Sequence, residues 1–463
     1  MAKYKKSWSK KYSLLRSKTN ILKKMIGTYD SSTLIVTYDT AHTYFIIMKI
    51  AGNGEVIWAY DLGRYPEGSI DILDASQISD YYFVGITYKN TFQIFKINSV
   101  DGSLLMNKKY ENSQINMAYT DITLAINRSK IGINIFLTQK SSQETEGISA
   151  IINSFTKISM NYSGMVYLVK TYSRINGKTG QYGDLNITNV RNYKDGSSIM
   201  LAGNYIRRGL AEPDNPKGFI AKINKDDDIK YSYLISGVDN IKNIYETGFD
   251  TPTMIIAGDT TNNNTNNLYV ASINEDDSKL EYATTVLNWS TDIYSESKAS
   301  NFIIYDHNHY IILTSTLKNP YNTYCKSTQL FRIMLTPKNK TYTFGSIDYQ
   351  REIGFMDNKN FYVNAIGYSA DNHGAMLGGI TASEIDDSCE IIVCKLDKNL
   401  QLNWLDSAKA YLREIKPPND VSNNNKLIII KVDFKESQDI PNETEPRTVY
   451  NDVSNDVKAT DLA

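Results

Sequence analysis

The chain has 463 residues, enough for one large β-sheet domain or for two or three ordinary domains. Its 50 Lys and Arg residues nearly balance 51 Asp and Glu residues, and the resulting net charge of −1 argues against a general nucleic-acid-binding protein. Three cysteines without a Cys-x-x-Cys pair argue against a disulfide framework. No run of 18 apolar residues predicts a transmembrane helix, and the N-terminus lacks the apolar core of a signal peptide.

The N-terminal segment is basic, with nine Lys or Arg in the first 24 residues and no acid before Asp30. An organellar transit peptide would have a similar composition. However, Trp8–Tyr12 closely matches Met106–Tyr110, which ends a strand of an internal repeat. We therefore favour a structural strand over a targeting peptide for this segment.

Internal repeats dominate the rest of the chain. In each repeat an apolar run ends in Gly or Thr, a second apolar run ends in Lys-Ile or Lys-Leu, and a polar turn precedes a strand that often ends in Trp or Tyr. The clearest copies of the second half are Ile46–Trp58 and Ile392–Trp404. Several short strands in each repeat of about 45–60 residues are typical of a β-propeller.

The second repeat predicts the four strands of one blade. Their expected bounds are Gly68–Ala75, Asp80–Thr87, Thr91–Asn98 and Ser103–Tyr110. Asp101-Gly102 between the last two strands is a strong hairpin signal, because Gly accepts the positive φ that a tight turn requires.

Four insertions are expected between second and third strands, and such insertions usually collect on one face of a propeller. The longest belongs to the third repeat, where we expect a long loop before a third strand at Met165–Lys170. The four segments are Ser141–Ser163, Ile206–Pro216, Thr260–Asn267 and Lys318–Ser327.

The two ends of the chain are expected to close the ring. Leu427–Phe434 looks like a third strand, and Trp8–Tyr12 looks like the fourth strand that should follow it. The sequence thus predicts an all-β propeller of four-stranded antiparallel blades over residues 1–434, preferably seven blades, with six or eight as alternatives. Residues 435–463 are acidic, contain Pro441 and Pro446, and are predicted to form a disordered tail.

The repeat resembles the bacterial-type propeller repeat of delta-60-like proteins, in which Gly-x-apolar-apolar-x-Gly precedes Lys-Leu/Ile-Asp-x-x-Gly-x-x-x-Trp. The resemblance spans most of residues 8–434 and implies a surface, secreted or scaffold protein without assigned chemistry. The turn followed by Trp also resembles the tryptophan-docking motif of quinoprotein dehydrogenases. The adjacent Cys pair of many such enzymes is missing, which weighs against transferring their activity.

Few residues suggest chemistry. Asp306–His309 could hold a metal through two His on one strand face, but a polar turn is the favoured interpretation. Asn224–Asp228 and Asn274–Asp277 resemble parts of calcium loops without the required Gly and closing Glu, so we expect solvated turn acids. Aromatic residues at the fourth strands could stack on sugars, although packing between blades is favoured. They are Trp58, Tyr231 and Trp404.

These observations favour a non-catalytic binding or structural scaffold protein that presents propeller loops to a protein or glycan partner. The alternative is a carbohydrate hydrolase or lyase with its active site at the mouth of the central channel, built from carboxylates of different blades. No catalytic residue, metal site, cofactor, nucleic-acid partner or membrane span is predicted. An intracellular or virion setting is favoured, with a fragment of a surface protein as the alternative.

The binding surface is expected on the rim formed by the insertions. Charged and aromatic side chains are typical of interfaces, and two of the insertions supply them. The candidate binding residues are Arg207, Arg208, Lys217, Tyr321 and Tyr324.

Overall fold

The fold is taken from a computed structural model of residues 1–463. The structure describes the chain except residues 1–6, 15–19, 67, 77–78, 113–116, 128–130, 146–147, 175–181, 193–197, 209–215, 237, 248–252, 263–264, 275–279, 287–301, 306–309, 319–324, 335–346, 357–358, 369–374, 384–388, 398–400, 403–409, 415–427, 432–433, 438–441, 445–450, 453–456 and 462–463.

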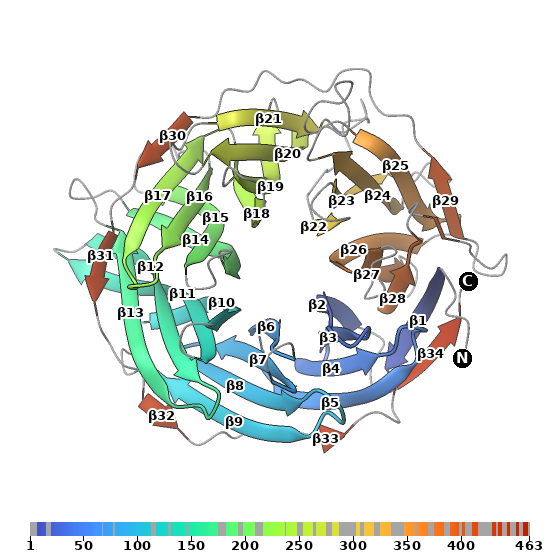
Figure 1. The fold of residues 1–463 in the computed structure, drawn as a ribbon, viewed down its shortest axis with the longest axis horizontal. Coiled ribbons are helices and arrows are strands. Elements are labelled where there is room, and N and C mark those ends of the chain that lie inside the picture. Colours follow the sequence, from blue (N-terminus) through green and yellow to red (C-terminus); the bar gives the residue numbers. More distant parts are fainter. Residues whose placement is uncertain are drawn as a thin grey trace.

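The described strands form seven antiparallel sheets set like blades around a central axis (Figure 1). Blade 1 contains β2 (Asn20–Gly27), β3 (Thr33–Asp39), β4 (Tyr44–Ile50) and β5 (Val56–Arg64). Blade 2 contains β6 (Ser69–Asp74), β7 (Tyr81–Tyr88), β8 (Thr91–Asn98) and β9 (Leu104–Glu111). Blade 3 contains β10 (Met117–Asn127), β11 (Gly132–Thr145), β12 (Ile148–Asn161) and β13 (Val166–Arg174).

The remaining blades follow the same order from the axis outward. Blade 4 contains β14 (Tyr182–Asn192), β15 (Ile199–Arg208), β16 (Lys217–Ile223) and β17 (Ile229–Ser236). Blade 5 contains β18 (Asn240–Thr247), β19 (Thr253–Asn262), β20 (Thr265–Asn274) and β21 (Leu280–Val286). Blade 6 contains β22 (Phe302–Tyr305), β23 (Tyr310–Lys318), β24 (Lys326–Met334) and β25 (Ile347–Phe355). Blade 7 contains β26 (Lys359–Tyr368), β27 (Ala375–Ser383), β28 (Cys389–Lys395) and β1 (Trp8–Leu14).

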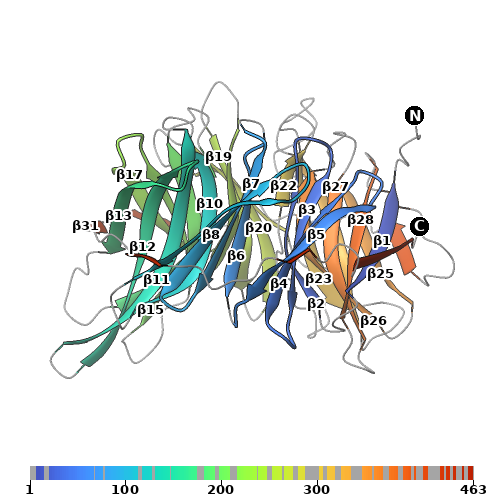
Figure 2. The same cartoon turned by 90° about the horizontal axis from the view of Figure 1, so that it is seen from below.

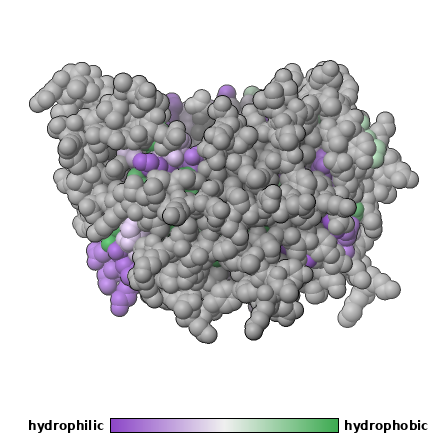
Figure 3. Space-filling model, turned by 90° about the horizontal axis from the view of Figure 1, so that it is seen from above, coloured by the Kyte–Doolittle hydropathy of each residue, from purple (hydrophilic) through white to green (hydrophobic). Residues whose placement is uncertain are grey.

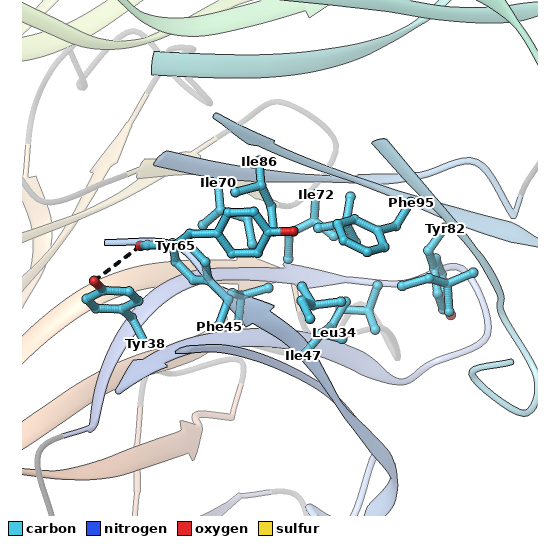
Figure 4. Close-up of a cluster of buried hydrophobic side chains, with 14 of the residues drawn as sticks. Leu34, Tyr38, Phe45, Ile47, Tyr65, Ile70, Ile72, Tyr82, Ile86 and Phe95 are labelled. Carbon is cyan, nitrogen blue, oxygen red and sulfur yellow. Dashed lines mark hydrogen bonds between the residues drawn. The ribbon is translucent and has the colours of Figure 1, made fainter. Parts of the chain in front are cut away.

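The predicted all-β propeller of four-stranded antiparallel blades is confirmed, and no helix occurs among the described residues. In the second repeat the expected strands match β6–β9 within about one residue at each end. Blade-to-blade packing supplies the core. Between blades 1 and 2, for example, Leu34, Phe45 and Ile47 pack with Tyr82 and Phe95 (Figure 4).

The predicted N-terminal closing strand is also confirmed. Strand β1 pairs with β28, with Trp8 opposite Lys395, and so supplies the fourth strand of blade 7. Closure by strands from both ends of the chain is confirmed as well, because β34 (Val457–Asp461) pairs with β1 in the same sheet. The expected C-terminal segment was wrong. The described residues of Leu427–Phe434 lie in β30 (Ile428–Lys431), which pairs with β17 of blade 4, and at the start of β31 (Phe434–Ser437), which pairs with β13 of blade 3. The third-strand position of blade 7 is already taken by β28, so this apolar segment pairs with an outer edge elsewhere.

The described residues of 435–463 lie in strands, so the prediction of a disordered tail is wrong for them. Six short strands within residues 410–461, here called the C-terminal belt, pair with outer strands of six blades (Figure 1). Pairing at a sheet edge uses backbone groups, so a polar sequence without periodicity can form it. The strands are β29 (Ala410–Glu414), β30, β31 (Phe434–Ser437), β32 (Asn442–Thr444), β33 (Asn451–Asp452) and β34 (Val457–Asp461).

The third repeat differs from the expectation of a long loop. Ser141–Ser163 contains the end of β11 and all of β12, which pair over fourteen residues in an extended hairpin that projects from the disc (Figure 2). The predicted third strand at Met165–Lys170 is therefore the fourth strand, β13. The hairpin mixes apolar and polar residues over a long stretch, so the sequence did not reveal that its strands continue the β11–β12 ladder beyond the blade.

The Gly that ends the apolar run of three second strands lies inside the strand, opposite a β-bulge in the first strand. Gly203, Gly258 and Gly379 face such bulges in β14, β18 and β26. The bulge brings a first-strand carbonyl so close that a Cβ at Gly203 would collide with the Asn186 oxygen, and one at Gly258 with the Asn240 oxygen. Gly is therefore required at these positions because there is no room for a side chain between the first and second strands next to the channel.

Replacing Gly203 with Ala should destabilise the protein by about 1–3 kcal/mol, because the added methyl group must displace backbone. Gly367→Ala is the matched control, since a Cβ there has no neighbour closer than 3.4 Å. Urea unfolding of both variants measures the difference. Equal midpoints for the two variants would contradict the role of the bulge.

Candidate binding faces

The blade topology separates two faces of the ring. Antiparallel strands in sequence order put first-to-second and third-to-fourth turns on one face, here called the turn face. Second-to-third and fourth-to-first connections lie on the opposite face, here called the insertion face. The described residues that flank the expected insertions are strand ends at the insertion face, namely those of β15, β16, β19, β20, β23 and β24, together with the paired ends of β11 and β12.

Lysines of the third strands bind the turns of the next blade. Lys49, which is 3% exposed, donates to the Ser99 carbonyl of blade 2 at 2.5 Å. Lys96 of blade 2 donates to the Tyr162 carbonyl of blade 3 at 3.0 Å. The Lys of the Lys-Ile signal thus serves as a connection between blades.

Aromatic residues of the fourth strands bind the same turns. The hydroxyl groups of Tyr12, Tyr110 and Tyr172 donate to the carbonyls of Gly54, Gly164 and Asp227 at 2.6, 3.0 and 2.7 Å. These three acceptors have positive φ angles of 81°, 86° and 67°. Within one blade, the third-to-fourth turn therefore contacts the preceding blade, whereas the aromatic residue of the fourth strand contacts a turn of the next blade.

The fourth-strand aromatics are packing residues in the described part of the chain. Trp58 is 4% exposed and lies in the core between blades 1 and 2, while Tyr231 is 8% exposed and contacts Met254 of blade 5. Both agree with the favoured interpretation and leave no exposed stacking surface. Trp404 lies outside the described residues.

The calcium-like segment Asn224–Asp228 is a joint of this kind. Lys157 of blade 3, only 3% exposed, forms an ion pair with Asp227, and Lys170 donates to the Asp227 carbonyl at 2.6 Å. Asp227 is therefore not the solvated turn acid that was expected. Asp306–His309 and most of Asn274–Asp277 lie outside the described residues, and the described residues hold no group of three or more His, Cys, Asp or Glu side chains that could bind a metal ion.

Polar side chains of the inner strands join blades 1, 2 and 3 next to the channel. The Lys24 ammonium lies 2.6 Å from Asp71, and the other Asp71 oxygen accepts the Leu124 amide of blade 3 at 2.7 Å. Ser69 donates to Asp121, and burial raises the pKa of Asp121. Carboxylates on adjacent inner strands could serve acid–base chemistry. Thr188 binds the Ile241 carbonyl of the next blade in a similar way, so this pattern is one of inter-blade contacts.

The most exposed large apolar side chains among the described residues gather on the turn face. Tyr29, Val100, Ile131 and Met165 are 72, 70, 69 and 61% exposed, and each lies in or beside a first-to-second or third-to-fourth turn of blades 1–3. The Lys49 ammonium contacts both Asp30 and Ser99, the neighbours of Tyr29 and Val100. This ammonium therefore holds the two apolar side chains on adjoining turns.

The predicted binding residues are only partly described. Arg207 and Arg208 end β15 and pair with Gly183 and Tyr182, while the half-buried Lys217 begins β16. These three residues are strand ends at the insertion face, whereas Tyr321 and Tyr324 lie outside the described residues. The sequence reasoning missed the apolar turn residues, because each occurs singly and the repeat alone places them on one face.

Figure 3 shows one side of the ring. The few residues coloured there are mostly hydrophilic, with small hydrophobic areas among them. The described residues also contain no helix of the length and apolar character that a membrane span requires.

Comparison with known proteins supplies no family. No protein-family model matches the chain, and no curated protein matches it. The proposed resemblance to bacterial-type repeats therefore has no support from a family match.

Solved structures similar to this chain include other propellers. One is the Dos1 propeller, with 6% identity and a TM-score of 0.45 over 81% of this chain and 77% of that chain. Another is Drosophila plexin A in complex with semaphorin 1b, with 8% identity and a TM-score of 0.35 over 72% and 86%. A third is dihydro-heme d1 dehydrogenase NirN in complex with DHE, with 10% identity and a TM-score of 0.32 over 68% and 70%. These similarities carry no argument about function.

Acid should weaken the joint between blades 1 and 2. Burial favours a higher pKa for Asp30, but hydrogen bonds from Lys49, Ser32 and Thr28, together with the charge of Lys49, lower this pKa to about 2. The depressed pKa stabilises the folded state. This stabilisation is fully present above pH 3.8, the pKa of the carboxyl group in the unfolded chain, and is lost as the pH falls through about 2. Asp30→Asn should therefore be less stable than wild type at neutral pH and should approach it in acid.

The measurement is the urea midpoint from neutral pH to pH 2, with Glu55→Gln as control. Glu55 is an exposed carboxylate on a turn of the same blade, so its replacement removes one charge without removing the partner of a buried lysine. If Asp30→Asn costs no more stability than Glu55→Gln at neutral pH, the ion pair does not stabilise the joint.

Proposed function

We propose that this protein is a non-catalytic binding scaffold, and that the turn face of blades 1–3 receives a protein partner. The observation that carries the proposal is the concentration of the four most exposed apolar side chains of the described residues on this face. Exposed apolar groups on rigid turns are typical of protein interfaces. Aliphatic side chains at three of the four positions favour a protein surface over a glycan, which would stack on aromatic rings.

Rigid support strengthens this proposal. The turn that carries Val100 is held by Lys49, and the turn that carries Met165 is held by Lys96 and Tyr110. Tyr29 is fixed through its amide, which donates to Asp74 of blade 2 at 3.0 Å. Side chains on ordered backbone lose less conformational entropy on binding than those on flexible loops.

The enzymatic alternative has weaker support. Asp71 and Asp121 lie on adjacent inner strands, but Asp71 is 3% exposed and is occupied by Lys24 and by a backbone amide. A general acid or base must reach its substrate proton within hydrogen-bond distance. The contacts of Asp71 support a structural role, and the insertion-face residues Arg207, Arg208 and Lys217 remain a second candidate surface for a protein partner.

The double variant Tyr29→Ser and Val100→Ser should weaken partner binding by about tenfold or more, because buried anchor residues often contribute 2 kcal/mol or more each. Quantitative pull-down and titration with the recovered partner measure this loss. The control is Ile57→Ser with Leu105→Ser, which removes two apolar side chains, 48 and 47% exposed, from fourth strands.

A third variant, Arg207→Ala with Lys217→Ala, tests the insertion face in the same assay. Loss of binding with this variant and full binding with the Tyr29 and Val100 variant would place the partner on the insertion face. Equal losses with the fourth-strand control would remove the argument for either face.

A further inference from the structure

The C-terminal belt circles the ring in the direction opposite to the blades. Its strands pair in turn with β25 of blade 6, β17 of blade 4, β13 of blade 3, β9 of blade 2 and β5 of blade 1. The last strand, β34, reaches blade 7 and pairs with β1. The chain therefore surrounds its own disc and ends beside its first strand (Figure 1).

Strand β1 is the seam of the ring. It joins blade 7 through five residue pairs with β28, and it contacts blade 1 through Trp8 and Tyr12. The Trp8 indole donates to the Gly52 carbonyl at 2.8 Å, and both aromatic side chains are at most 2% exposed. Without β34, β1 would be an edge strand attached to the ring by one ladder, and edge strands open more readily than central ones.

Strand β34 converts this edge into a central strand. Lys10 to Leu14 pair one by one with Asp461 to Val457, so β1 has a ladder on each side. The belt strands before it are only two to five residues long, and short pairings at sheet edges open more readily than central ladders. Little pairing outside β34 therefore holds the belt on the ring, so the belt can be released while the blades stay folded.

We propose that the C-terminal belt is a releasable clasp, in which β34 holds the closing strand β1 in place and thereby keeps the ring shut. The outer strands under the belt can then pair with a further strand, and in this structure the belt strands of the same chain occupy those edges. A segment that removed β34 would gain access to the edge of β1 and loosen the contact between blades 7 and 1. This inference concerns ring closure and is independent of the proposed binding face.

Proline substitution in the full-length chain tests the clasp with a built-in control. In an antiparallel pair, successive residues alternate between an N–H that faces the partner strand and one that faces away. Ala459 and Thr460 lie opposite Tyr12 and Lys11, and β34 is the outermost strand of its sheet. One of Ala459→Pro and Thr460→Pro therefore removes a hydrogen bond to β1, whereas the other removes an outward N–H.

The readout is amide hydrogen exchange of residues 8–14 well below the melting temperature. One of the two variants should speed exchange there by about fivefold or more, the factor that corresponds to one backbone hydrogen bond, while blades 3 and 4 keep their protection. Wild-type exchange in both variants, or equal acceleration in both, would overturn the proposal.

A cysteine pair keeps the test valid if a proline variant fails to fold. Ser13 and Lys458 face each other, so Ser13→Cys with Lys458→Cys can form a disulfide across β1 and β34, in a background where the partly exposed Cys389 is replaced by Ser. Oxidation should slow exchange in residues 8–14 by about fivefold or more relative to the reduced form. A disulfide that forms and leaves this exchange unchanged would show that β34 does not limit seam opening.

Discussion

The joint between successive blades is the interaction on which the rest of the structure depends. Turns of one blade accept hydrogen bonds from lysines and tyrosines of the preceding blade. The carbonyls of Tyr162 and Gly164, for example, accept from the half-buried Lys96 and from Tyr110. The buried Lys49 binds a turn of blade 2 in the same way. Buried ammonium groups are costly unless their hydrogens are satisfied, so each lysine favours one spacing between blades. The ring gains its geometry from the repetition of this single contact.

The same joint explains how much of the fold can be predicted from the sequence. The Lys-Ile signal, the polar turn and the final aromatic residue follow one another in the sequence, and each contributes to a joint. The blade pattern can therefore be predicted from the sequence at Thr91–Tyr110. The Gly of second strands can be recognised for another reason, because a bulge in the first strand leaves no room for a side chain at Gly203. Because similar contacts recur between blades, the residues that form them recur in the sequence, and this repetition can be recognised.

Other features left no such trace. The belt pairs through its backbone, so Asn442–Thr444 and Val457–Asp461 carry no periodic apolar signal. Ile428–Lys431 has a strong strand signal, but its partner β17 belongs to blade 4, far away in the sequence, and no local signal identifies that partner. The candidate turn-face residues share a face only through topology, since Tyr29 and Met165 belong to different turns of different blades. Such features can be identified only in the structure, because they arise from contacts between segments that are distant in the sequence.

The position of β1 also bears on how the chain folds. Trp8 and Tyr12 are made before the blades, but their partners in β28 come from near residue 395, and the strand that covers them follows later still, at Val457–Asp461. Contacts between such distant segments are slow to form, because a long loop must close before they stabilise anything. During synthesis the first strand must therefore wait, with two large aromatic side chains unprotected, until almost the whole ring has been made. Nine basic residues in the first 24 provide charge repulsion during that wait, which would help nascent copies stay apart.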